Sequence, residues 1–166
     1  MDSARVAVLF GSDSDWSVMK SAVEQLRAFD VQPLVEVVSA HRTPERAAEL
    51  ASGAAERGIE VIIAGAGLAA ALPGVIAAHT HLPVIGVPLA SGSLQGVDAL
   101  LSIAQMPPGV PVACVGIGSA GARNAALLAV EILAAKDQAL ADRYRAFREE
   151  QSNKVAEKNR KLQEQL

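Results

Sequence analysis

The sequence has one cysteine and few aromatic residues. Cys114 lies inside the apolar run 112–115, so the chain has no second cysteine for an internal disulfide or for a metal site built from cysteines. We expect this residue to be a small, buried part of the core. Aromatic residues make up 3% of the chain, and its 51% hydrophobic content comes mainly from Ala, Val, Leu and Ile. This composition favours helices packed closely on a sheet and predicts an α/β protein.

The chain also lacks an excess of basic residues and a long apolar segment. Its formal net charge of -3 argues against a nucleic-acid-binding protein, which usually carries a basic face to neutralise phosphates. No apolar run reaches the roughly 18 residues that a membrane span needs, and no signal-peptide pattern opens the sequence. We therefore expect a cytoplasmic protein that acts without a membrane or a nucleic acid.

No linker rich in Pro, Gly or Ser divides the 166 residues. We expect one domain over residues 1–136, which the motifs described below indicate to be catalytic, and a helical extension over residues 137–166. The extension is charged and has few apolar residues, so one interpretation is a solvated, frayed tail. The other is an arm that packs on a neighbouring subunit. We favour the arm, because Tyr144 and Phe147 are among the few aromatic residues of the chain.

Short β-branched runs alternate with longer amphipathic segments along the chain. The short runs are apolar throughout, which is typical of parallel strands covered by helices on both faces. The longer segments place apolar residues three and four positions apart, which predicts crossover helices. The predicted strands are residues 5–10, 35–38, 61–64, 84–87 and 112–115, and the predicted helices are residues 16–29, 44–57, 68–79, 96–104 and 120–135.

Polar or glycine-rich clusters follow each predicted strand. In an open parallel sheet, ligands bind beyond the carboxyl ends of the strands, near the point where the strand order reverses. We therefore expect one edge of the sheet to carry the functional surface, and the first two clusters to meet if their strands are neighbours. The clusters are residues 11–15, 39–44, 65–67, 88–93 and 116–121.

The first cluster, Gly-Ser-Asp-Ser-Asp at 11–15, is typical of a turn that holds a phosphate at a helix N-terminus. No P-loop motif occurs anywhere in the chain, which argues against nucleoside triphosphate hydrolysis. Asp13 and Asp15 would repel a phosphate if both faced it, so at least one of them binds sugar hydroxyls or caps the following helix. Helix capping by Ser14 or Asp15 is an alternative explanation of the whole cluster.

Two further motifs are weaker evidence for a binding site. Residues 116–121 match the pattern G-x-G-x-x-G, but no later strand ends in an acidic residue that would bind a ribose, so we assign no NAD and expect a tight turn near the pocket. His79 and His81 have no third ligand nearby in the sequence, so we expect loop histidines and no metal site.

His41 and Arg42 form the most informative pair. An imidazole gives or takes a proton near neutral pH, and a guanidinium binds a phosphate or a carboxylate through two parallel hydrogen bonds. Ser39, Thr43 and Pro44 surround this pair where a strand is expected to end, and Thr43 is placed to cap a helix that has proline at its first position. The segment therefore predicts a site with acid/base chemistry.

With these motifs placed, the chain resembles the PurE family, the N5-carboxyaminoimidazole ribonucleotide mutases of purine biosynthesis. The resemblance covers most of residues 5–135. It is highly specific because six motifs occur together, of which Ser-Ala-His-Arg-Thr-Pro is the most distinctive. The motifs lie at residues 11–15, 38–44, 64–67, 86–88, 102–111 and 120–129.

The resemblance implies a flavodoxin-like three-layer sandwich with a five-stranded parallel sheet, assembled as a homo-octamer that the C-terminal helix helps to build. It implies an isomerase that moves a carboxylate from N5 to C4 of an aminoimidazole ribonucleotide, without a metal or other cofactor. His41 is then the general acid and base, and Arg42 is the phosphate contact. The substrate-binding residues expected beside Arg42 are Ser12, Ser14, Asp15, Ser39, Gly65 and Gly67.

Two positions depart from the family pattern. Where the family usually has A-G-x-G-G-A-A-H-L-P-G, this chain has Leu68 in place of a glycine and Ala71 in place of a second histidine. We keep the mutase prediction because His41 is present. The alternatives are a diverged PurE-like protein, either weakly active or a non-catalytic binding or assembly protein, and a related carboxylase that uses CO2 directly.

Overall fold

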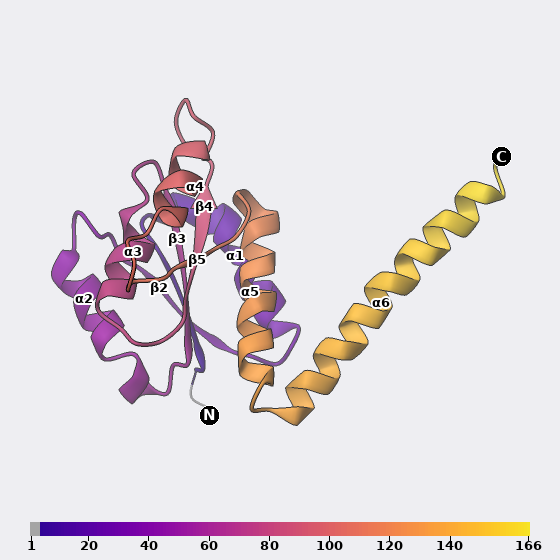
Figure 1. Ribbon diagram of the computed structural model, residues 1–166, viewed down its shortest axis with the longest axis horizontal. Helices are drawn as coiled ribbons and strands as arrows, with labels where there is room; N and C mark the ends of the chain where they lie inside the picture. Colours follow the sequence, from indigo (N-terminus) through magenta and orange to yellow (C-terminus); the bar gives the residue numbers. More distant parts are fainter. Residues whose placement is uncertain (1–3) are drawn as a thin grey trace. The chain divides into compact units, whose positions relative to one another are not determined.

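A five-stranded, entirely parallel sheet forms the centre of the compact unit that extends through Ala129 (Figure 1). The computed structural model describes residues 4–166, so the first three residues of the predicted domain lie outside the described part. The strand order is β2-β1-β3-β4-β5, the doubly wound arrangement in which the chain changes direction between β1 and β3. The strands are β1 (Val6–Phe10), β2 (Pro33–Val37), β3 (Val61–Gly67), β4 (Val84–Leu89) and β5 (Ala113–Cys114).

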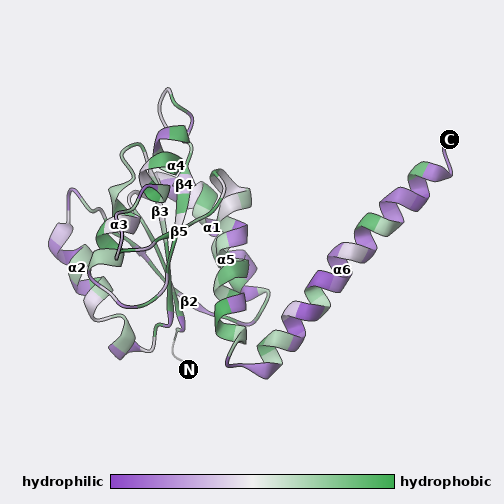
Figure 2. Ribbon diagram, viewed as in Figure 1, coloured by the Kyte–Doolittle hydropathy of each residue, from purple (hydrophilic) through white to green (hydrophobic). Residues whose placement is uncertain are grey.

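The inner strands are apolar because helices cover both faces of the sheet. Every residue of β1 and of β4 is buried, as are the first six residues of β3. Figure 2 shows these strands in the colours of hydrophobic residues. β2 lies at one edge and is only partly buried. The continuous apolar runs of the sequence are thus the strands that need cover on two sides.

Helices α2 (Pro44–Ser52), α3 (Ala71–Ala78) and α4 (Val97–Ala104) cover one face of the sheet (Figure 1). α1 (Trp16–Arg27) and the first turns of α5 (Gly118–Ala134) cover the other face. Arg46 of α2 binds both carboxylate oxygens of Glu36 in β2, at 2.8 and 3.1 Å, and so ties the edge strand to its helix. The predicted flavodoxin-like three-layer sandwich is confirmed.

Several elements end where the sequence pattern did not indicate it. The expected helix 44–57 stops at Ser52, and only a short 3-10 turn, Ala55–Arg57, continues it. β3 runs on to Gly67, so α3 starts at Ala71 and not at residue 68. β5 is two residues long, and Cys114 is only partly buried there, in contrast to the expected core position. That partial burial raises the pKa of the Cys114 thiol.

The chain forms two compact units, one through Ala129 and one from Val130 to Leu166. The division falls inside α5, so the domain boundary expected at residues 136 and 137 stays a prediction. The second unit contains α6 (Gln138–Gln163), whose first turn is capped by the Asp137 carboxylate, which accepts the Leu140 N–H at 3.1 Å. Within this unit the Tyr144 hydroxyl donates to Glu131. Along residues 4–166, none of the helices combines the length and apolar character of a membrane span.

Candidate functional site

The turn after β1 is organised by its own hydroxyl groups. Ser12 precedes a short 3-10 helix, Asp13–Asp15, and its Oγ accepts the Ser14 N–H at 3.4 Å. The Ser14 hydroxyl lies 2.9 Å from the same oxygen. The chain therefore turns sharply between β1 and α1 and presents two hydroxyls and two carboxylates at the carboxyl end of the sheet.

Asp15 precedes α1 but does not cap it through its side chain. Partial burial raises the pKa of its carboxyl, although the backbone N–H groups of Ser12 and Gly11 and the charge of Arg42 act in the opposite direction. The carboxylate is thus held by the turn that it follows. Helix capping by Asp15 does not account for the cluster, and a ligand can reach its oxygens.

The turn after β2 is fixed by Ser39 and Thr43. The Thr43 Oγ1 accepts the Ser39 N–H at 3.0 Å and donates to the Ser39 carbonyl at 3.1 Å, so this hydroxyl closes the turn and does not cap α2. The Ser39 Oγ accepts the Arg42 N–H at 3.2 Å. Both hydroxyls therefore hold the backbone between them, where His41 and Arg42 project.

Arg42 connects the two turns. Its Nη2 donates to the Gly11 carbonyl at 2.9 Å, across 31 residues of sequence. The contact exists because β1 and β2 are paired along their whole length, from Val6 beside Pro33 to Phe10 beside Val37. The sequence prediction that the two clusters meet is therefore correct. One bond to a carbonyl leaves most of the five guanidinium N–H groups for a ligand.

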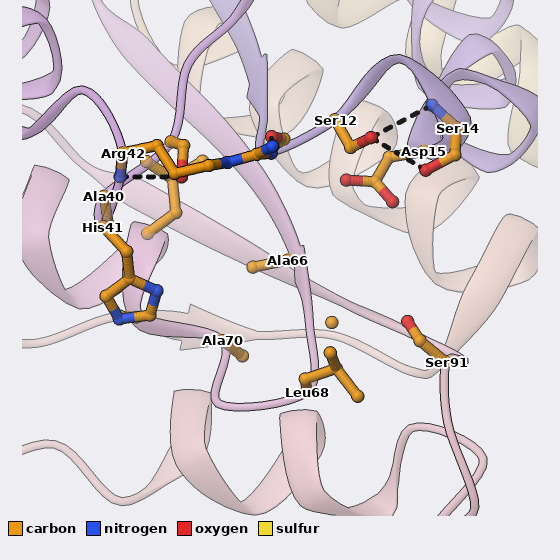
Figure 3. A pocket seen from close by; sticks show the side chains of 15 residues that line it. Ser12, Ser14, Asp15, Ala40, His41, Arg42, Ala66, Leu68, Ala70 and Ser91 are labelled. Atoms are coloured by element: carbon orange, nitrogen blue, oxygen red, sulfur yellow. Dashed lines mark hydrogen bonds between the residues drawn. The ribbon is translucent and has the colours of Figure 1, made fainter.

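The residues of both turns line a cavity of about 320 Å³ at the switch point between β1 and β3 (Figure 3). This volume falls in the range of small-molecule sites. In Figure 3 the Arg42 guanidinium reaches toward Ser12, whereas the His41 ring lies on the side of Ala70. The His41 imidazole makes no hydrogen bond with any residue of the range 4–166, so its nitrogens are accessible to a ligand. The lining residues are Gly11, Ser12, Ser14, Asp15, Ser39, Ala40, His41, Arg42, Ala66, Gly67, Leu68, Ala70, Ala71, Leu72 and Ser91.

All but one of the site residues expected from the sequence line this cavity. The exception is Gly65, which lies within β3 against α1. A Cβ at Gly65 would come within 2.5 Å of the Met19 sulfur, so the position lets strand and helix approach closely. Gly67 does line the cavity, and a Cβ there would lie 2.3 Å from the Ser91 Oγ.

Ser91 is a lining residue that the sequence alone did not single out. It follows β4, inside the polar cluster 88–93 that was expected at the same edge, but nothing in its neighbours distinguishes it from Ser93. The pairing of β3 with β4 brings it to Gly67. The motif at residues 116–121 and the pair His79 and His81 do not line the cavity. No group of three or more His, Cys, Asp or Glu suited to a metal occurs in the part of the chain that the structure describes.

The comparison with known proteins identifies the family. The AIR carboxylase family model matches residues 5–154. This chain belongs to the AIR carboxylase family. It is similar to the N5-carboxyaminoimidazole ribonucleotide mutase of Mycobacterium tuberculosis, with 58% identity, covering 96% of this chain and 90% of the relative. The mutase of Escherichia coli is 54% identical, over 93% of this chain and 91% of the relative.

A solved structure agrees with that assignment. The crystal structure of Treponema denticola PurE has a TM-score of 0.84 to this family member, at 29% identity, and the match covers 95% of this chain and 97% of the other. The resemblance to PurE proteins drawn from the sequence motifs is therefore confirmed.

The two departures from the family pattern both lie in the cavity wall. Leu68 has a φ of 55°, in the left-handed region that glycine adopts freely and that costs another residue roughly 1–2 kcal/mol. Ala70, two residues later, has a φ of 45°. Ala71, where the family usually has a histidine, is the first residue of α3. The turn thus keeps a conformation suited to glycine but places an apolar side chain in it.

Proposed function

We propose that this protein is an N5-carboxyaminoimidazole ribonucleotide mutase, a cofactor-free isomerase of purine biosynthesis. The observation that carries the proposal is the joining of His41 and Arg42 with the turn after β1 in one cavity at the switch point of the sheet. Relatives that are 54–58% identical over nearly the whole chain have this name. The site offers an anion-binding group and a proton carrier, which are the two groups that the reaction needs.

The polar side of the cavity suits a ribose phosphate. In the proposed complex, Arg42 binds the phosphate, because its guanidinium is fixed by the Gly11 carbonyl and offers further donors. Asp15 accepts hydrogen bonds from ribose hydroxyls. Ser12 and Ser14 donate to the same part of the ligand, and Ser39 holds the Arg42 backbone in place. The absence of a side chain at Gly67 lets the Ser91 hydroxyl approach the end of β3 at the cavity wall.

His41 carries out both proton transfers. As an acid it protonates N5 of the carbamate, and the N–C bond breaks to release CO2 and leave an electron-rich aminoimidazole. C4 of that ring attacks the CO2 and forms the new C–C bond. C4 then bears a proton beside the carboxylate, and the neutral His41 imidazole removes it to restore the aromatic ring. The proton given in the first step returns in the second, so the reaction balances without a cofactor.

A comparison of two substrate mixtures tests this proposal. One contains the N5-carboxylated ribonucleotide, and the other contains the decarboxylated aminoimidazole ribonucleotide with bicarbonate. We expect rapid formation of the C4-carboxylated product from the first mixture only. Rapid product from the second mixture alone would instead identify a carboxylase that uses CO2.

A second candidate function is favoured by Leu68 and Ala71. Loss of a polar ring from the cavity wall is compatible with a diverged PurE-like protein that binds the ribonucleotide and turns it over slowly or not at all. The same two mixtures decide between the candidates. Measurable binding of the ribonucleotide without product from either mixture would support the binding protein and contradict the mutase.

We further propose that the protein works in the cytoplasm as a homo-octamer and that α6 contributes to the contacts between subunits. Nearly all residues of α6 beyond Leu140 are partly or fully exposed, and Val155 and Leu162 are exposed apolar side chains. Oligomers with closed symmetry bury such residues against copies of the same chain.

A further inference from the structure

Leu68 is an apolar side chain that lies outside the hydrophobic core. Its backbone is in the left-handed region, where glycine would be unstrained, and its side chain is 54% exposed. The residue is therefore neither conformationally favoured nor part of the core. Strained backbone positions cluster at functional sites, and Leu68 lines the cavity that contains His41.

The Leu68 side chain extends from the turn after β3 to the loop after β4. A Cβ at Gly92 would lie 2.9 Å from the Leu68 Cδ2, so the leucine packs directly on the Gly92 backbone. The preceding residue, Gly67, is also close to this loop, since a Cβ there would lie 2.3 Å from the Ser91 Oγ. Leu68 therefore bridges two loops at the rim of the cavity (Figure 3).

The part of the cavity wall beside Leu68 is also apolar. In Figure 3 the His41 ring lies on the side of Ala70 and Leu68, away from the carboxylate of Asp15. Ala71, where the family usually has a histidine, adds a methyl group to the lining. The cavity thus has a polar part, formed by the turn after β1 and by Arg42, and an apolar part near the proton carrier. The lining residues of the apolar part are Ala40, Ala66, Leu68, Ala70, Ala71 and Leu72.

We propose that Leu68 is a positioning residue that retains CO2 beside the aminoimidazole ring and excludes water from it. This inference rests on the proposed mutase function, whose intermediate is a free CO2 molecule. CO2 has no net charge and accepts only weak hydrogen bonds, so an apolar wall holds it without competing with its reaction. Leu68 lines the apolar part of the cavity and keeps CO2 there until C4 captures it.

Retention of an isotope label tests the proposal. The substrate carries 13C in its carboxylate, the buffer contains unlabelled bicarbonate, and the product is collected from a single turnover. We expect the wild-type protein to keep nearly all of the label. In Leu68→Gly and Leu68→Ala the loss of label, together with the yield of decarboxylated ribonucleotide, should rise at least fivefold. A substrate blank without protein is subtracted.

The two variants distinguish the effect of the Leu68 side chain on label retention from the effect of its backbone conformation. Leu68→Gly removes the side chain and relieves the left-handed backbone, so its melting temperature should equal or exceed that of the wild type. Leu68→Ala removes most of the side chain but keeps the strained backbone. If only the glycine variant loses label, the cause is backbone freedom and the proposal is wrong.

Leu94→Ala is the matched control. Leu94 is 59% exposed, precedes α4 and does not line the cavity. Its removal should leave label retention unchanged. Wild-type retention in both Leu68 variants would overturn the role of Leu68 and leave the mutase function intact, whereas absence of product from the wild-type protein would contradict the function itself.

Discussion

In the proposed ribose site, Asp15 is a residue whose binding role would come at the expense of stability. Its carboxyl is partly buried in the turn after β1, and that burial raises its pKa above the ordinary value of 3.8. The native state therefore binds the Asp15 proton more tightly than the unfolded chain does. The favourable contribution of this group to stability is complete below the unfolded pKa and is lost as the pH rises through the folded pKa. At neutral pH the ionised Asp15 carboxylate therefore lowers the stability of the native state, a cost that the proposed ribose contact would account for.

Asp15→Asn should consequently raise the melting temperature of the protein and weaken its binding of the ribonucleotide. At pH 7 we expect a melting temperature higher by about 1–2 °C, since solvent screens much of the effect at this half-exposed position. The difference should shrink as the pH falls below about 4, where both proteins carry a neutral side chain. The KM for the ribonucleotide should rise about tenfold, because a charged hydrogen bond to the ligand is lost.

Calorimetry across pH 3 to 8, with steady-state kinetics at pH 7, measures both effects. A lower melting temperature for Asp15→Asn at pH 7 would show that the carboxylate stabilises the turn and would contradict the inferred direction. An unchanged KM would remove Asp15 from the proposed ribose site.

Other residues of the site show what a sequence can and cannot predict. His41, Arg42, Ser12 and Asp15 could be identified because they stand in distinctive motifs directly after predicted strands. Ser91 could not, because its place beside Gly67 depends on how far β3 and β4 continue and on their pairing. The left-handed backbone of Leu68 could not be predicted either, because leucine rarely adopts a positive φ and so gives no indication of one.

At the scale of elements, the segment 116–121 shows how a glycine motif can serve packing and not ligand binding. Gly121 lies in the first turns of α5, and a Cβ there would come within 1.5 Å of the Gly116 carbonyl oxygen. The loop before α5 therefore passes directly over the helix. Gly116 itself has nothing within 4 Å of such a Cβ.

The two glycines make a matched pair of variants. Gly121→Ala should lower the free energy of unfolding by about 1–3 kcal/mol, because a backbone carbonyl must move to accommodate the methyl group. Gly116→Ala should change it by less than about 0.5 kcal/mol, since the methyl group points into open space. Urea unfolding at one fixed protein concentration measures both. Equal destabilisation by the two substitutions would contradict the close approach seen at Gly121.

The strands could be predicted well because both faces are covered and their apolar runs are uninterrupted. The ends of the helices could not be predicted as well. α2 ends early, at Ser52, and the extension of β3 to Gly67 delays the start of α3. Both effects depend on the local turn and on strand pairing, which hydrophobic spacing does not encode.

For the molecule as a whole, the strand order is what brings the site together. β1 lies between β2 and β3, so the turns that follow these three strands converge on one cavity. The switch point could be expected from an alternating strand and helix pattern, but the order itself needed either the structure or the family resemblance. The assembly of subunits also concerns the molecule as a whole.

The proposed octamer predicts a particle of about eight times the 17.2 kDa of one chain. Light scattering coupled to size-exclusion chromatography measures that mass directly. A truncation before Gln138, which removes α6, should lower the oligomer mass or make it dependent on concentration. A full chain that elutes with the mass of one or two copies would contradict the octamer.

The replacement of His41 by asparagine tests most directly whether one imidazole both delivers and recovers the proton. Asparagine keeps a polar side chain of similar reach but cannot exchange a proton near neutral pH. We expect kcat to fall by about 10² to 10⁴-fold, while the dissociation constant of the ribonucleotide, measured by calorimetry, stays within about threefold because Arg42 and Asp15 are unchanged. A kcat for His41→Asn within tenfold of the wild-type value would show that another group moves the proton.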